Sequence, residues 1–224
     1  MRVAKTRIII VDDHPVVREG FARFIETQED LAICAVAESC SDALERIKTC
    51  QPHLVIVDLS LKDGDGLDLL GDITRHFPEV ASLVVSVRDE MLYAVRAMRL
   101  GARGYVSKGE NREKVLEAIR QVMNGGYYFS PAVQRQLFGL SGATVPKGAR
   151  EVHDPLKALT DRELQILRFI GMGYSTRRIA ECLHLSVKTV DTHRLHIKAK
   201  LNTPTMSELV RLAVHWTSRE GAVK

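Results

Sequence analysis

The first 125 residues alternate short apolar runs with amphipathic stretches, and this alternation constrains the fold more than any other feature of the chain. Five apolar runs, RIIIVD, LAICAVA, HLVIVDL, SLVVSV and GYVS, are each followed by a stretch whose apolar residues have helical spacing. Apolar runs without polar alternation suit strands that are covered on both faces. Strand–helix repeats imply a parallel sheet with right-handed crossovers. We therefore predict a doubly wound, five-stranded parallel α/β domain over residues 1–125, with helices at 15–28, 40–50, 66–76, 90–100 and 111–124.

The next segment, residues 126–157, has the composition of a linker. It concentrates Gly, Pro, Ser and Lys in GGYYFSP and GLSGATVPKGAREVHDP, and these residue types favour turns and loops. One short helix, near 131–138, is expected within it. The sequence therefore predicts two domains joined by this linker.

Residues 158–224 show a purely helical pattern. Thr160 and Glu163 have the spacing of a capping box, and Ser175 and Ser186 stand where the N-caps of two further helices are expected. Only LHLS separates the middle pair, which is too short for anything except a tight helix-turn-helix. We predict a small all-α helix-turn-helix domain, with helices at 160–171, 176–183, 187–201 and 205–217.

Charge differs between the two predicted domains, although the whole chain carries only +4. Residues 1–125 hold 17 basic and 20 acidic side chains, a net −3, whereas residues 158–224 hold 11 basic and 6 acidic side chains, a net +5. A basic segment favours a polyanionic partner, although a solvated helix surface can look the same.

Two other classes of protein are disfavoured. The four cysteines have neither CxxC spacing nor the density of a disulfide framework, so we expect reduced packing residues and no zinc site. No apolar run approaches the roughly 20 residues that span a bilayer, and the N-terminal residues lack the order of a secretory signal. We therefore expect a cytoplasmic protein with no membrane association.

Polar residues end four of the predicted strands. Asp12 and Asp13 follow the first apolar run, Asp58 the third, Ser86 the fourth and Lys108 the fifth. Ligands of open α/β sheets bind outside these carboxyl ends. Clustered carboxylates raise one another's pKa unless a cation lies among them, and Mg²⁺ prefers oxygen ligands. The pattern therefore predicts a Mg²⁺ site at this edge of the sheet.

The same residues supply the groups needed for phosphoryl transfer, in which catalysis is mostly positioning and charge neutralisation. Asp58 is the expected nucleophile because a carboxylate can form an acyl phosphate. Lys108 and the metal would neutralise the incoming oxygens, and the Ser86 hydroxyl would hydrogen-bond the attached phosphoryl group. Each residue alone also fits a helix cap or an ordinary polar strand end. An Mg²⁺-dependent phosphatase with an aspartate nucleophile is the alternative from another class, although VDDHP lacks its D-x-D spacing and no lid is inserted.

The set Asp12, Asp13, Asp58, Ser86 and Lys108 resembles the receiver domain of two-component response regulators. LTDREL and IAECLHLSVKTVDTH resemble the helix-turn-helix output domain of the NarL/LuxR-type subfamily. The resemblance implies that Asp58 accepts phosphate from a partner sensor histidine kinase. It further implies that the Ser60 backbone carbonyl joins the aspartates Asp13 and Asp58 around Mg²⁺.

The resemblance also implies that Tyr105 is the aromatic residue that rotates on phosphorylation. Two positions depart from the family pattern. Gly109 stands where many receivers have proline, and Val87 stands where a smaller residue is common. The bulk of Val87 is expected to crowd the phosphate and to slow its arrival or loss.

The predicted helix 187–201 has two faces. Val190, His193, Ile197 and Leu201 recur at spacings of three and four and mark the face that packs on the preceding helices, so His193 is expected to be structural. The opposite face of such a helix reaches base edges in the major groove, where Lys can read guanine, Asp cytosine, and Thr or Leu the thymine methyl. The candidate base contacts are Lys188, Asp191, Thr192 and Leu195, and the candidate phosphate contacts are Thr176, Arg177, Thr189, Arg194 and Lys198. A merely solvated basic face is the alternative.

The last predicted helix carries an apolar stripe that could bury against a second copy of the chain. The stripe consists of Met206, Leu209, Val210, Ala213 and Val214. Packing of these residues inside their own domain is the alternative.

Together these features predict a phosphorylation-switched, DNA-binding transcription regulator that catalyses only its own phosphorylation and dephosphorylation. Phosphorylation of Asp58 is expected to pull Ser86 and Tyr105 toward the site and to favour a homodimer on double-stranded DNA. A phosphorylation-independent regulator with a passive receiver is the alternative.

Overall fold

The computed structural model of the protein describes residues 5–61, 64–138 and 155–221. The chain forms two compact units, Met1–Leu140 and Ser141–Lys224. Residues 126–138 of the predicted linker belong to the first unit, and residues 139–154 lie outside the described residues.

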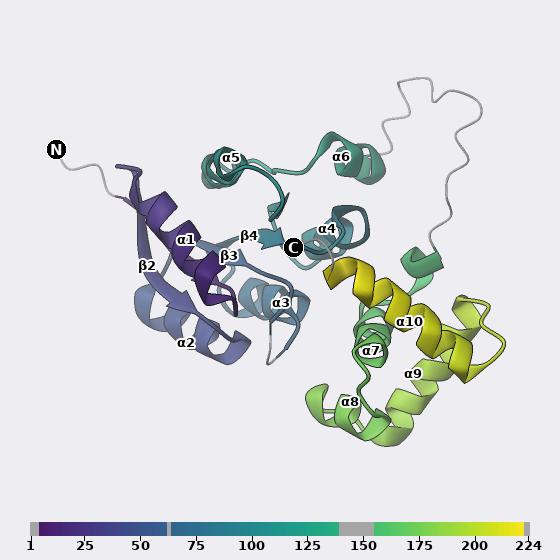
Figure 1. Cartoon of the computed structure of the whole chain (residues 1–224). Helices are drawn as coiled ribbons and strands as arrows, with labels where there is room; N and C mark the ends of the chain where they lie inside the picture. The colour runs from purple at the N-terminus through teal and green to yellow at the C-terminus, as the bar shows by residue number, and fades with distance from the viewer. Residues whose placement is uncertain (1–4, 62–63, 139–154, 222–224) are drawn as a thin grey trace, which may run out of the picture. The chain divides into compact units, whose positions relative to one another are not determined.

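The first unit is built on a parallel sheet of five strands in the order β2-β1-β3-β4-β5 (Figure 1). The strands are β1 (Thr6–Val11), β2 (Leu31–Ala37), β3 (Leu54–Val57), β4 (Ala81–Ser86) and β5 (Gly104–Ser107). Strands β3 and β4 are buried along their whole length, as their continuous apolar runs predicted. The predicted five-stranded parallel sheet is therefore confirmed.

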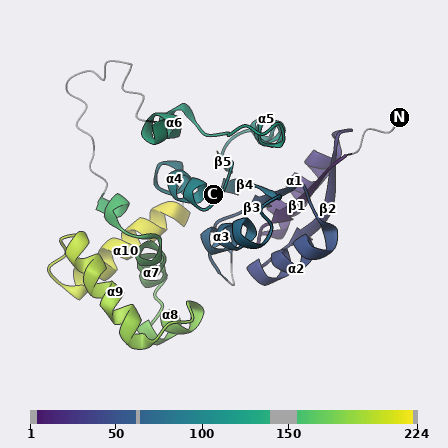
Figure 2. The ribbon, with the colours of Figure 1, turned by 180° about the vertical axis from the view of Figure 1, so that it is seen from behind.

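Five helices connect and cover these strands. They are α1 (Pro15–Glu26), α2 (Cys40–Cys50), α3 (Gly66–His76), α4 (Glu90–Arg99) and α5 (Arg112–Met123). The strand order reverses after β2, so the crossovers place α1 and α5 on one face and α2, α3 and α4 on the other (Figures 1 and 2). All carboxyl ends of the strands consequently meet at one edge of the sheet.

The chain continues past α5 along the outer edge of β5. Tyr128 forms a parallel bridge to Gly104; its amide donates to the Arg103 carbonyl at 2.9 Å, and its carbonyl accepts from the Tyr105 amide at 2.8 Å. A side chain at Gly104 would lie 2.9 Å from the Tyr128 carbonyl, so only glycine allows this approach. Helix α6 (Pro131–Phe138) follows and packs on α4. Residues 126–138 thus extend the first unit.

The second unit is entirely helical in its described part. A short 3₁₀ helix (Pro155–Ala158) precedes α7 (Asp161–Gly171), α8 (Thr176–Cys182), α9 (Val187–Lys200) and α10 (Met206–Gly221). The predicted capping box and both serine N-caps are present. Between α8 and α9 the chain turns at His184, whose φ of 52° is in the left-handed region. Within the described ranges, no helix is long and apolar enough to cross a membrane.

Candidate phosphorylation site and nucleic-acid interface

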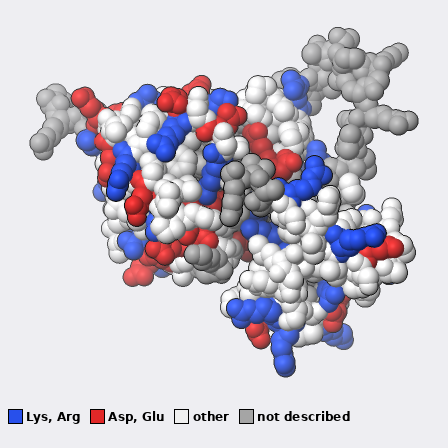
Figure 3. Space-filling model, viewed as in Figure 1, with Lys and Arg blue, Asp and Glu red and all other residues white. Residues whose placement is uncertain are grey.

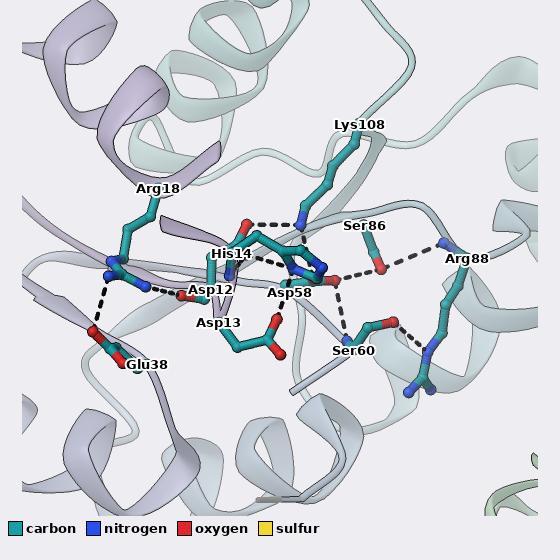
Figure 4. A network of polar contacts seen from close by, with 10 residues as sticks. All are labelled: Asp12, Asp13, His14, Arg18, Glu38, Asp58, Ser60, Ser86, Arg88 and Lys108. Atoms are coloured by element: carbon teal, nitrogen blue, oxygen red, sulfur yellow. Dashed lines mark hydrogen bonds and ion pairs between the residues drawn. The ribbon is translucent and has the colours of Figure 1, made fainter. Parts of the chain in front are cut away.

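The structure brings the five predicted polar residues of the strand ends together at one edge of the sheet (Figure 4). Asp12, Asp13 and Asp58 are 3%, 8% and 2% exposed, and Ser86 is fully buried. Strands β1, β3 and β4 are buried at their carboxyl ends, and Asp12, Asp58 and Ser86 stand at or directly after those ends, so their side chains emerge beside one another. Carboxylates at such depth require compensating partners.

Asp58 lies at the centre of this group. Its Oδ1 accepts hydrogen bonds from the Ser86 hydroxyl at 2.7 Å and from the Ser60 amide at 3.1 Å. Its Oδ2 lies 2.7 Å from Lys108 Nζ, which also contacts Asp12 Oδ2 at 2.7 Å. Burial alone lowers the pKa of Lys108, but the carboxylates of Asp58 and Asp12 outweigh burial and raise that pKa above its ordinary value. Lys108 is therefore a protonated ammonium that bridges two aspartates.

Asp12, Asp13, His14 and Asp58 each place one potential ligand atom within 4.8 Å of the others. His14 Nδ1 lies 2.7 Å from Asp13 Oδ1, and the His14 amide donates to Asp12 Oδ1 at 2.8 Å. The carboxylate oxygens match the hard oxygen ligands that Mg²⁺ prefers, so the donor set fits the predicted cation. His14 was missed by the sequence reasoning, although it directly follows the aspartate pair.

A second buried charge adjoins the site. The Arg88 guanidinium is within 3.2 Å of both Asp65 carboxylate oxygens and donates to Ser60 Oγ at 3.2 Å. It also lies over the Tyr93 ring, 4.9 Å from the centroid. The carbonyl of Arg88 accepts a hydrogen bond from the Tyr105 hydroxyl at 2.8 Å, and Tyr105 is 1% exposed. Arg88 therefore joins the loop after β4 to the loop after β3.

Arg88 was also missed by the sequence reasoning. An arginine that follows a strand end has the sequence signature of a surface residue, and no motif distinguishes this one. Gly66 is a second position near the site whose residue type is restricted by its surroundings. A side chain there would lie 2.4 Å from the Asp58 carbonyl. Of the two unusual positions, Val87 is half-buried and Gly109 is exposed.

In the second unit, α9 presents the two predicted faces. Val190 and Ile197 are fully buried and Leu201 is 8% exposed, as expected for the packed face. His193 is half-buried beside them, with its Nδ1 buried and unpaired in this structure. The four candidate base contacts, Lys188, Asp191, Thr192 and Leu195, are all exposed.

The candidate phosphate contacts have more varied surroundings. Arg177 is exposed, whereas Thr176, Thr189 and Lys198 are half-buried. Arg194 Nη1 donates to Thr176 Oγ1 and lies 3.7 Å from Asp191 Oδ1, so these two candidates join α8 to α9. Lys and Arg side chains are spread over the visible surface of the helical unit (Figure 3).

Both units match known families. The response regulator receiver domain matches residues 8–120, and the luxR family of bacterial regulatory proteins matches residues 157–213. The chain is a response regulator of the NarL/LuxR type. A receiver domain is thus followed by a LuxR-type helix-turn-helix domain.

This response regulator has similar relatives along almost its whole length. The oxygen regulatory protein NreC of Staphylococcus carnosus (strain TM300) is 35% identical over 209 residues, which cover 93% of this chain and 96% of that protein. NreC of Staphylococcus haemolyticus (strain JCSC1435) is 36% identical over the same shares. Among solved structures, RcsB from Salmonella enterica serovar Typhimurium, bound to promoter rprA with phosphomimetic BeF3−, has a TM-score of 0.72 and 25% identity. The match covers 92% of this chain and 97% of that one.

The response regulator also holds a cluster in its helical domain that resembles a metal site. Glu163, His193 and His196 place ligand atoms within 4.8 Å of one another. Glu163 Oε2, however, already accepts from Lys200 Nζ at 2.6 Å and from the Thr160 amide at 2.7 Å. Burial alone raises the pKa of Glu163, but these hydrogen bonds outweigh it and lower that pKa. The Glu163 carboxylate is therefore engaged by the Lys200 ammonium, and this ion pair joins α7 to α9.

The predicted dimerisation stripe on α10 divides between core and surface. Leu209 and Ala213 are fully buried inside their own domain, so the prediction that they face a second copy is corrected. The Ala213 carbonyl lies close to Gly171 of α7. A side chain at position 171 would come within 2.5 Å of this carbonyl oxygen. Val210 and Val214 are 37% and 43% exposed, and Met206 is half-buried.

Proposed function

We propose that this response regulator is a transcription regulator whose DNA binding is controlled by phosphorylation of Asp58. The observation that carries the proposal is the buried Asp58 carboxylate. It accepts hydrogen bonds from the Ser86 hydroxyl, the Ser60 amide and the Lys108 ammonium together. A hydroxyl, an amide and an ammonium are the groups that can receive the oxygens of a phosphoryl group.

The proposed donor is a phosphohistidine on a sensor histidine kinase. An Asp58 oxygen attacks its phosphorus, the P–N bond breaks as the P–O bond forms, and the imidazole leaves. Asp13, Asp58 and the Ser60 carbonyl would hold Mg²⁺, with Asp12 beside them, and the cation would neutralise charge on the phosphoryl oxygens. Lys108 supplies further positive charge at the same place, because its pKa is raised.

We propose that the switch then runs through Ser86 and Tyr105. The Ser86 hydroxyl, which now donates to Asp58, would donate to the phosphoryl group. The loop after β4 would move with it and carry along the Arg88 carbonyl to which Tyr105 is bonded. This changes the surface near α4 and β5, on which residues 126–138 pack.

The output step is binding of double-stranded DNA by α9, with α8 against the backbone. The net +5 of residues 158–224 supports a polyanionic partner. Solved structures of RcsB bound to promoter DNA share the fold of this chain. We propose a homodimer on DNA, with Met206, Val210 and Val214 as the part of α10 left for contact between copies. A cytoplasmic location suits this role.

The test is phosphorylation of the full chain by labelled acetyl phosphate with Mg²⁺. The wild type should take up label that hydroxylamine releases, as expected of an acyl phosphate, and a chelator should prevent uptake. Asp58→Asn should take up none, because an amide is not nucleophilic. Asp30→Asn, at an exposed carboxylate just before the amino end of β2 and so at the edge of the sheet opposite to Asp58, is the matched control and should behave as the wild type. Undiminished label in Asp58→Asn would show that the site is assigned wrongly.

A further inference from the structure

The outward face of α9 carries a row of exposed residues that is uncharged beyond its first member, Lys188, and is bordered by charged residues. Lys188, Thr192, Leu195 and Ala199 follow one another at spacings of four, three and four, so they form a single line along the helix. All four are exposed. Leu195 is 61% exposed, more than any other large hydrophobic residue in the described part of this unit.

Thr192 adds to the apolar character of this row. Its hydroxyl donates to the Lys188 carbonyl at 3.0 Å, one turn back along the same helix. The hydroxyl is thereby engaged within the helix, and the methyl group is what remains for an outside partner. Beyond Lys188, the row therefore presents a methyl group, an isobutyl group and a second methyl group.

Charged groups border the row on both sides. Asp191 has 57% of its side chain exposed and is paired at 3.7 Å with Arg194. Lys198 lies two turns after Asp191 on the same side, and Lys200 lies on the opposite side, bonded to Glu163. A polyanion can thus lie against the side of the helix that carries Arg194 and Lys198 while the centre meets an apolar group. In the major groove of DNA, the apolar group on a base edge is the C5-methyl of thymine.

We propose that Thr192 and Leu195 read thymine C5-methyl groups, so that thymines are required at two nearby steps of the specific site. This inference rests on the proposed function, in which α9 enters the major groove. Residues three apart on a helix are separated by about 4.5 Å along its axis. Successive base pairs are separated by roughly 3.4 Å. The two side chains therefore reach methyl groups on neighbouring base pairs.

The test replaces thymine by deoxyuridine, which lacks the methyl group and keeps every hydrogen-bonding edge. The full chain, treated with acetyl phosphate and Mg²⁺, is first used to select its preferred duplex from a random library. Each thymine is then replaced in turn. Replacement at two neighbouring steps should weaken binding about fourfold each, the value expected for one buried methyl group.

Variants at Thr192 separate the methyl group from the hydroxyl. Thr192→Ser removes the methyl group, and its affinity for the selected duplex should fall about fourfold. At the step that Thr192 reads, replacing thymine by deoxyuridine should then weaken binding by this variant no further. Thr192→Val keeps a methyl and removes the hydroxyl, and it should bind as tightly as the wild type. Leu195→Ala should lose sensitivity at the other step. The control is Arg177→Ala, an exposed candidate phosphate contact, which should weaken all duplexes and keep the full deoxyuridine effect.

The outcomes distinguish this inference from the function on which it rests. Sequence-specific binding that deoxyuridine does not change, or that Thr192→Val weakens and Thr192→Ser does not, overturns the methyl readout alone. Selection that yields no sequence preference overturns both the methyl readout and the proposed function.

Discussion

The polar edge of the receiver sheet and the outward face of α9 use their side chains in opposite ways. At the sheet edge, Asp12 and Asp58 are buried and Lys108 is half-buried, and each contacts at least one of the others. On α9, Lys188 and Leu195 are exposed and stand clear of the core. The first region is organised before any partner arrives, and the second completes its contacts only on a partner.

This difference follows from the cost of burying charge. A buried charge without a partner is costly, so the sheet edge must contain its own compensation, and the positions of its groups are fixed by one another. An exposed charged side chain stays hydrated, so it has no desolvation cost, and it keeps its rotamer freedom. Under the proposed function, reaction chemistry is located in the rigid region and sequence recognition in the adaptable one.

Arg88→Ala should give the largest effect and tests whether buried pairs carry the receiver's stability. Removal of the guanidinium leaves Asp65 buried at 8% exposure without its ionic partner. Breaking a buried pair typically costs about 3–5 kcal/mol. Denaturant unfolding of the full chain should show this loss in the receiver transition. Arg178→Ala, which breaks an exposed pair with Glu181, should cost less than about 1 kcal/mol and is the matched control. Equal losses would remove the contrast between buried and exposed pairs.

Leu209→Ala and Val210→Ala compare core with surface on one helix. Leu209 is fully buried, and its truncation should destabilise the helical domain by about 2–5 kcal/mol. Val210 is 37% exposed, so its truncation should leave thermal unfolding nearly unchanged and should weaken dimer formation on DNA. Thermal unfolding and sedimentation of the DNA complex measure the two effects. A strong loss of stability from Val210→Ala would place that side chain in the core.

Glu163 gives a smaller, pH-dependent effect in the helical domain. Its pKa is lowered on folding, so it stabilises the domain above its unfolded pKa near 4.3, and this contribution is lost as pH falls through the lower folded pKa. The melting temperature of the wild type should therefore fall toward that of Glu163→Gln as pH drops from 6 to about 3. At neutral pH the variant should lose the ionic contact with Lys200, which is worth about 1 kcal/mol, while Gln can still accept from the Thr160 amide. A difference between the two that is independent of pH would contradict the ionic role.

Lys198→Ala should give the smallest effect and tests the border of the α9 face. Loss of one phosphate contact should weaken specific and scrambled duplexes alike and reduce the slope of log K against log salt by roughly 0.9. Binding measured at several salt concentrations gives this slope. A change in sequence preference without a change in slope would show that Lys198 contacts bases and not the DNA backbone.

The two regions also differ in how far the sequence predicts them. The receiver sheet and the meeting of Asp12, Asp58, Ser86 and Lys108 could be predicted, because strand ends are marked by the change from apolar to polar residues. Arg88 could not, because its burial depends on a carboxylate 23 positions away and on the ring of Tyr93. Pairing across sequence leaves no local pattern.

On the helical domain, capping residues predicted the starts of α7, α8 and α9. The α10 stripe was harder, since apolar spacing alone does not tell a face that packs on α7 from a face that meets a second copy. Leu209 and Ala213 lie on the buried side of this stripe, and Val210 lies on its exposed side. The pairing of Tyr128 with β5 was missed for a related reason, because the Gly and Pro residues around it indicate a linker and the pairing is a tertiary contact.

The most direct test of the central claim is the affinity of the full chain for its selected duplex before and after treatment with acetyl phosphate and Mg²⁺. The account predicts that treatment tightens binding by the wild type and by Asp30→Asn, and that it leaves Asp58→Asn unchanged at the untreated affinity. Equal affinity of the wild type with and without treatment, while label is present on Asp58, would make the receiver a passive module and contradict the account.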